Sequence, residues 1–214
     1  MQSRLLEALE AFSGVYSGWI LWNLFLAFIP LVLSFWLFRR KTDARSVLWW
    51  IGWLVFLAFL PNAPYLLTDI IHLIRGTRVG YAIWIIALVF IPLHIAAILS
   101  GFEAYVVSLI NQGHYLKRQG QRHLVLWSEL AMHALCAIGI YLGRFRRLNS
   151  WDLVTDPGNV LLTTIDDLTA KLPLLVVLIT FVILTILYWV MKQITLGLLL
   201  RFRDAHRNKL IKSD

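Results

Sequence analysis

Five long apolar runs, almost free of charged residues, alternate along the chain with short polar segments. A helix needs about 20 apolar residues to cross the roughly 30 Å hydrocarbon core of a bilayer. Each run is close to that length, so the pattern predicts an all-α protein, a polytopic bundle of about five transmembrane helices. The predicted spans cover residues 18–38, 47–68, 79–101, 123–143 and 173–191.

No internal repeat, low-complexity tract or long flexible linker interrupts this pattern, so residues 1–214 are predicted to form a single integral membrane domain. Residues 1–17 carry two glutamates within their apolar stretch. This favours an amphipathic helix on the membrane surface over a secretory signal. Residues 192–214 are predicted to form a basic C-terminal tail.

The second span is the irregular one. Its unbroken apolar part ends at Leu60, too short to cross the bilayer, so the span must continue through Pro61 and Pro64 to about Thr68. Proline lacks a backbone donor and clashes with the preceding turn, so the sequence predicts a broken helix at Pro61/Pro64. We expect Asn62 to cap the helix that restarts at Pro64.

The distribution of Lys and Arg predicts the orientation of the bundle, because short cytoplasmic loops are enriched in these residues. An outside N-terminus and a cytoplasmic C-terminus place thirteen of the 20 basic residues inside. This orientation is favoured, although it leaves Arg144, Arg146 and Arg147 outside. In either orientation, the segments after the second and fourth spans emerge on one face, which we call the outer face.

Composition narrows the class of protein. Only 15% of the residues are charged and the mean hydropathy is +0.72, which excludes an ordinary soluble domain or a disordered chain. The single Cys136 excludes an intramolecular disulfide. In a soluble protein, a net charge of +8 would suggest a nucleic-acid partner. In a membrane protein, Lys and Arg determine the topology and contact anionic lipid headgroups, which explains the charge. Membrane lipids are therefore the expected partners, and nucleic acid is not.

Two polar segments on the outer face contain the candidate site residues. Tyr65, Asp69 and His72 follow Pro64 at spacings that share one helical face. Asp69 and His72 are the catalytic candidates, because such a pair can transfer protons or ligate a metal. The alternative is that both residues cap helix ends and bond to the neighbouring loop.

The segment after the fourth span adds an arginine cluster. Arg144 and Arg147 share a helical face, and guanidinium groups hold phosphate or carboxylate through two parallel hydrogen bonds. The alternative is headgroup contact plus a salt bridge to Asp69 or Asp152. The candidate ligand-binding residues of the outer face are Asn62, Tyr65, Arg144, Arg147, Asn149, Ser150 and Asp152.

Glu129 and His133 fall within the fourth predicted span, and Glu103 lies on the apolar extension of the third. Such groups are costly in hydrocarbon, so we expect them to face the bundle interior, to pair or to be protonated. A proton relay and packing without chemistry are both open, and packing is favoured. Asn23 and Asn111 are candidates for hydrogen bonds between helices. No zinc, phosphate-loop or hydrolase motif occurs, so no metal site is predicted and any cofactor is unknown.

Several segments stand out beyond the apolar pattern: LFLAFIP (24–30), FLPNAPY (59–65), TDIIHL (68–73), GIYLGRF (139–145) and NSWD (149–152). With them the chain resembles a bacterial integral membrane family known as domain of unknown function 1361, over about residues 18–191. The resemblance implies a multi-pass protein of the bacterial cytoplasmic (inner) membrane. It brings no reaction, substrate or cofactor, and it marks the two outer-face segments as signature regions.

Two classes of function remain open, and whether the protein is an enzyme is uncertain. The first is a polar outer-face site that binds an anionic lipid headgroup or a small envelope substrate. As an enzyme, it would use Asp69 and His72 for proton transfer. As a proton-coupled transporter, it would use Glu129 and His133 and act as a homo-oligomer. The second class is a non-catalytic membrane scaffold or assembly partner.

Overall fold

The computed structural model describes residues 19–40 and 45–211, with side chains described up to Ala205. Nearly all of these residues are helical, and none of them forms a strand. Five segments are long and apolar enough to cross a membrane: Ile20–Phe38, Val47–Thr77, Ile83–Arg118, Leu124–Arg146 and Lys171–Ala205. The predicted all-α architecture with five spans is confirmed. The helix expected within residues 1–17 lies outside the described residues.

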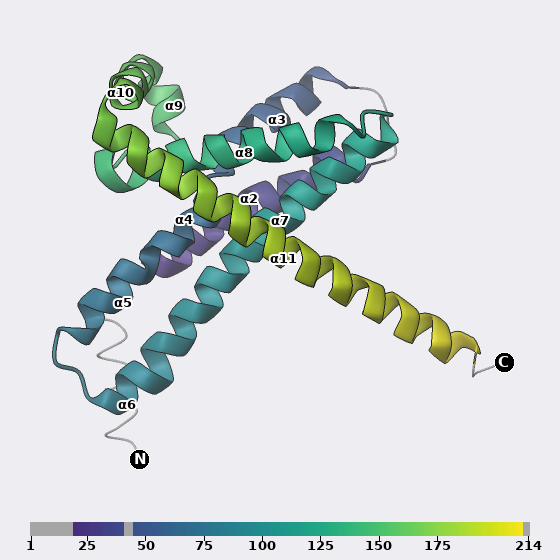
Figure 1. Cartoon of the computed structure of the whole chain (residues 1–214), viewed down its shortest axis with the longest axis horizontal. Coiled ribbons are helices and arrows are strands. Elements are labelled where there is room, and N and C mark those ends of the chain that lie inside the picture. The colour runs from purple at the N-terminus through teal and green to yellow at the C-terminus, as the bar shows by residue number, and fades with distance from the viewer. Residues whose placement is uncertain (1–18, 41–44, 212–214) are drawn as a thin grey trace.

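The first span, α2 (Trp19–Phe38), runs beside the main helix of the third, α7 (Ile91–Arg118) (Figure 1). Small buried side chains on α2, Ala27 and Ser34, allow the two helices to approach closely. The Asn111 amide of α7 donates a hydrogen bond to Ser34 Oγ at 2.9 Å. The predicted role of Asn111 between helices is therefore confirmed.

The second span comprises α3 (Val47–Phe59), α4 (Asn62–Tyr65), a 3₁₀ turn η1 (Leu66–Asp69) and α5 (Ile70–Thr77). The predicted break at Pro61/Pro64 is not confirmed, because Leu60 and Pro61 both keep right-handed helical backbone angles. Pro64 cannot donate to the Leu60 carbonyl, and the Ala63 amide donates to it instead, at 3.2 Å. A tightened turn thus absorbs the missing donor.

The third span begins with α6 (Ile83–Ile85) and a π-helical turn, η2 (Ile86–Phe90), before α7. The fourth, α8 (Leu124–Tyr141), ends in another π-helical turn, η3 (Leu142–Arg146). Arg147 then takes a left-handed conformation, with φ 58°, which ends the helix. A side chain at Gly139 of α8 would collide with the ring of Pro61. The fourth span therefore lies directly against α4.

The segment after η3 forms two short helices, α9 (Asp152–Thr155) and α10 (Pro157–Thr169), where the sequence predicted none. Asp156 caps α10 by accepting a hydrogen bond from the backbone N–H of Asn159 at 3.2 Å, and Pro157 occupies the first helical position. The fifth span, α11 (Lys171–Ile211), packs on α8 and continues well beyond the predicted end at Met191. Its C-terminal end extends away from the other helices (Figure 1).

The short helix α4 is the point where the bundle converges. It contacts α2, α7 and α8, so the second span touches the first, third and fourth at one level. Leu60, Ala63 and Leu66 are fully buried there.

Candidate functional site

The two outer-face segments meet through Arg144. Its Nη2 lies 3.0 Å from Asp69 Oδ1, forming an ion pair. Its Nε also donates a hydrogen bond to Thr68 Oγ1 at 3.1 Å. The guanidinium carbon lies 4.9 Å from the centroid of the Tyr65 ring, a cation–π distance. The salt bridge to Asp69, one of the two expected alternatives, is the arrangement that the structure shows.

Asp69 is held from a second direction as well. The Asn23 amide of α2 donates a hydrogen bond to Asp69 Oδ2 at 3.0 Å, which confirms the predicted role of Asn23 between helices. With 1% of its surface exposed, Asp69 joins three spans at one carboxylate. His72 lies one turn further on in α5 and is half-buried.

Asn62 and Ser150 form a second link between the same segments. The Asn62 amide donates hydrogen bonds to Phe59 O at 3.0 Å and to Ser150 Oγ at 2.8 Å. The expectation that Asn62 caps the restarted helix is therefore wrong: no side-chain cap forms at the start of α4. The span stays helical, so no restarted end needs a cap, and the amide is available to the loop.

Asp152 acts within its own loop. Its Oδ2 accepts a hydrogen bond from the backbone N–H of Asn149 at 2.6 Å, which closes the turn that brings Asn149 and Ser150 against α4. This turn places two of the predicted ligand-binding residues beside Asn62.

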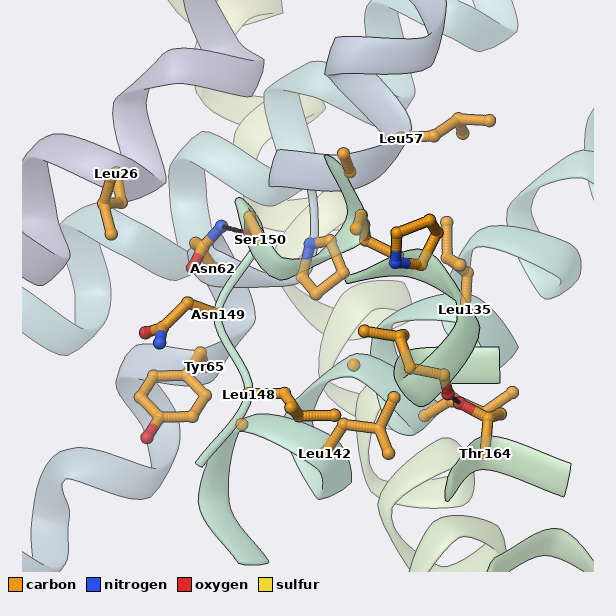
Figure 2. Close-up of a pocket in the computed structure, with 18 of the residues that line it drawn as sticks. Leu26, Leu57, Asn62, Tyr65, Leu135, Leu142, Leu148, Asn149, Ser150 and Thr164 are labelled. Carbon is orange, nitrogen blue, oxygen red and sulfur yellow. Dashed lines mark hydrogen bonds between the residues drawn. The ribbon is translucent and has the colours of Figure 1, made fainter. Parts of the chain in front are cut away.

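A cavity of about 570 Å³ opens between these segments, α2, α8 and α10. Figure 2 shows Asn62, Asn149 and Tyr65 on one side of it, and Leu57 and Leu135 on the other. Most of the wall is apolar. The polar side chains that line it are Asn23, Asn62, Tyr65, Asn149, Ser150 and Thr164. The predicted residues Asn62, Tyr65, Asn149 and Ser150 thus share one cavity, whereas Asp69, His72, Arg144, Arg147 and Asp152 do not line it.

Arg146 fixes α10 over the cavity. It forms a two-pronged ion pair with Asp167 of α10, with Arg146 Nε 2.8 Å from Asp167 Oδ2. Hydrogen bonding from this guanidinium lowers the pKa of the Asp167 carboxyl below its ordinary value. Asp167 could not be identified from the sequence, because nothing around it signals a partner 21 residues away. Arg147 has an exposed side chain as well.

The intramembrane candidates lie in a separate cluster, between α8, α7 and α11. Glu129 forms an ion pair with Lys192 and accepts a 2.8 Å hydrogen bond from the Tyr188 hydroxyl. His133 is bonded to the Tyr105 hydroxyl. Both buried groups on α8 therefore pair inside the bundle, as expected for the cost of charge in hydrocarbon.

Glu103 is bonded in a similar way. It accepts a hydrogen bond from Thr195 Oγ1 of α11 at 2.8 Å. The contacts of Thr195 and Tyr188 could not be predicted from the sequence. A single hydroxyl within an apolar run does not indicate which residue lies opposite it. Within the described residues, no group of three His, Cys, Asp or Glu side chains could hold a metal ion.

The signature segments predicted from the sequence are thus the ones that meet at the cavity. No curated protein and no solved structure matches the chain. A family model described as "Protein of unknown function (DUF1361)" matches residues 22–186, most of the chain. The chain therefore belongs to the DUF1361 family.

Proposed function

We propose that the protein binds an amphiphilic ligand in the outer-face cavity. The observation that carries this proposal is the cavity of about 570 Å³, which both signature segments line. That volume lies within the range of small-molecule sites, about 300–1,000 Å³. An apolar wall with a few polar groups on one side matches a ligand with a hydrocarbon part and a headgroup.

The polar side favours a headgroup rich in hydrogen-bond acceptors. Asn62, Asn149 and Tyr65 line this side. The side-chain amide of Asn149 and the phenol of Tyr65 can donate to phosphate, ester or sugar oxygens, whereas both amide hydrogens of Asn62 are already donated to Phe59 O and Ser150 Oγ. The nearby guanidiniums of Arg144 and Arg146 are already paired with carboxylates. An anionic lipid headgroup or a small envelope substrate would therefore be held mainly by neutral donors, with the exposed Arg147 adding positive charge.

The setting of this site is part of the proposal. We infer a bacterial inner membrane, an outside N-terminus and a cytoplasmic C-terminus, so that the cavity faces the envelope. The burial of Asp69 between Arg144 and Asn23 favours binding over acid–base catalysis by this carboxylate. A proton-coupled transporter would act as a homo-oligomer and use Glu129 and His133, which lie in a different cluster.

One substitution tests the cavity directly. Leu161 of α10 lines it, whereas the next residue, Leu162, does not, and the two are 61% and 64% exposed. Leu161→Trp should fill the cavity, and Leu162→Trp is the matched control. The measurement is the melting temperature of the detergent-purified protein with dioleoylphosphatidylglycerol or dioleoylglycerol added.

We expect at least one of these probes to raise the melting temperature of the wild type and of Leu162→Trp, and to have little effect on Leu161→Trp. The probe that acts reports whether the headgroup must be anionic. Equal shifts in all three proteins, or none in any of them, would overturn the proposal.

A membrane scaffold is the second candidate function, and the contacts of Asp69 with Arg144 and Asn23 favour it. Such an ion pair and hydrogen bond stabilise loops without requiring a ligand. If neither amphiphile stabilises the wild type, and Asp69→Asn lowers both stability and co-purification of a partner protein, the scaffold is the better account.

A further inference from the structure

At the end of the bundle opposite the cavity, two guanidinium groups are held on one aromatic ring. Tyr115 lies near the end of α7 and is 7% exposed. Arg45, which precedes α3, donates a hydrogen bond from Nε to the Tyr115 hydroxyl at 2.9 Å. The guanidinium carbons of Arg45 and Arg118 lie 5.7 Å and 5.9 Å from the Tyr115 ring centroid.

The surrounding helices fix both groups. Arg118 donates to the carbonyl oxygens of Phe38 and Arg40, the latter at 3.1 Å, so it caps the carboxyl end of α2. Arg45 also lies over the Trp49 ring, at 5.5 Å. The two cations are thus positioned by packing and hydrogen bonds.

No anion in the described part of the chain balances this pair. The three ion pairs among the described residues involve neither Arg45 nor Arg118. Arg40, Lys117 and Arg122 add further exposed positive charge at the same end. Basic residues gathered at one end of the bundle repel one another, so a bound anion would lower the energy of the arrangement.

The adjacent surface identifies the kind of anion. Val47 and Leu48, at the start of α3, are 77% and 62% exposed and belong to a membrane-spanning segment. A ligand at Arg45 therefore has an apolar surface beside it. We propose that Arg45 and Arg118 bind the phosphate of an anionic phospholipid whose acyl chains lie along α3. The donors of a guanidinium group match phosphate geometry, and basic sites beside transmembrane helices bind such headgroups.

The test uses the full chain in neutral detergent, with dioleoylphosphatidylglycerol, dioleoylphosphatidylcholine or inorganic phosphate as the probe. Arg45→Gln removes an exposed arginine from the cluster. Arg203→Gln makes the same charge change on an exposed position of α11 and is the control. The measurements are melting temperature and lipid retention in native mass spectrometry.

We expect phosphatidylglycerol to raise the melting temperature of the wild type and of Arg203→Gln by several degrees more than phosphatidylcholine does. Arg45→Gln should lose at least half of that difference and most of the retained lipid. Equal selectivity in all three proteins would overturn the proposal, as would equal losses in both variants. An equal effect of inorganic phosphate would show a soluble-anion site and would also overturn it.

Tyr115 is a positioning residue in this proposal. Tyr115→Phe keeps the ring but removes the hydroxyl that accepts from Arg45. It should leave the melting temperature in phosphatidylcholine unchanged and reduce the selectivity for phosphatidylglycerol. A fall in stability that is the same in both lipids would show a purely structural role for the hydroxyl and would contradict this assignment.

Discussion

At the residue scale, Asp69 and Arg144 of the outer face form an ion pair with each other. Asp69 accepts hydrogen bonds from Asn23 and Arg144, and its exposed fraction is 1%. Removing one partner of such a pair leaves the other charge poorly compensated, which costs more than the pair itself contributes. The contacts of Asp69 therefore point to stability, while the neutral residues of the cavity wall are available to a ligand.

Replacing the carboxylate tests this division. Asp69→Asn should destabilise the protein by about 3 kcal/mol, because the half-buried Arg144 loses its counter-charge. The double variant Asp69→Asn/Arg144→Gln should be less destabilised than Asp69→Asn alone. Reversible unfolding in a denaturant gives the free energy of unfolding of each variant. Asp152→Asn, in the segment that follows η3, is the control. A melting profile of Asp69→Asn identical to the wild type would contradict the structural role.

At the element scale, the membrane spans could be predicted from the apolar runs, whereas the structure of the segments that connect them could not. The number and order of the five spans could be predicted because bilayer thickness sets the length of apolar helix that a crossing needs. The ends of the second, third and fifth spans could not, since these helical segments continue to Thr77, Arg118 and Ala205. The helicity of α10 could not, because its short and partly polar sequence has no long apolar run, and its position depends on Asp167 meeting Arg146. The candidate site could be predicted only in part, because its geometry also depends on packing. Parity brought the two segments to one face, but only packing decides that Asn62 turns toward Ser150.

The attachment of α10 should depend on pH. Arg146 holds the pKa of Asp167 below its ordinary value, so the ion pair contributes stability that is fully present above the ordinary carboxyl pKa, near 4. That contribution is lost as the pH falls through the lowered pKa of the folded state. Wild type should therefore melt above Asp167→Asn at pH 7, and the gap should close at low pH.

The neighbouring Asp166 is exposed, so Asp166→Asn is the control for this titration and should show a much smaller gap at every pH. The measurement is the melting temperature of each protein from pH 7 downward. A gap between wild type and Asp167→Asn that stays constant to the lowest pH would show that the ionised carboxylate is not what holds α10.

At the scale of the whole molecule, the bundle offers different chemistry at its two ends. One end has the cavity enclosed by α2, α4, α8 and α10, with neutral polar groups on one side. The other has guanidiniums held around Tyr115. The paired Glu129 and Lys192 lie between α8 and α11. The amphiphile proposed for the cavity is independent of the lipid proposed at the Tyr115 end.

The most direct test of the amphiphile proposed for the cavity is the mass of what co-purifies with the protein. Wild type, Leu161→Trp and Leu162→Trp would be extracted from membranes under mild conditions and examined by native mass spectrometry. We predict that wild type and Leu162→Trp carry the same bound amphiphile, and that Leu161→Trp has lost it while remaining folded. Retention of that species by Leu161→Trp at the wild-type level would contradict the account, as would its absence from the wild type.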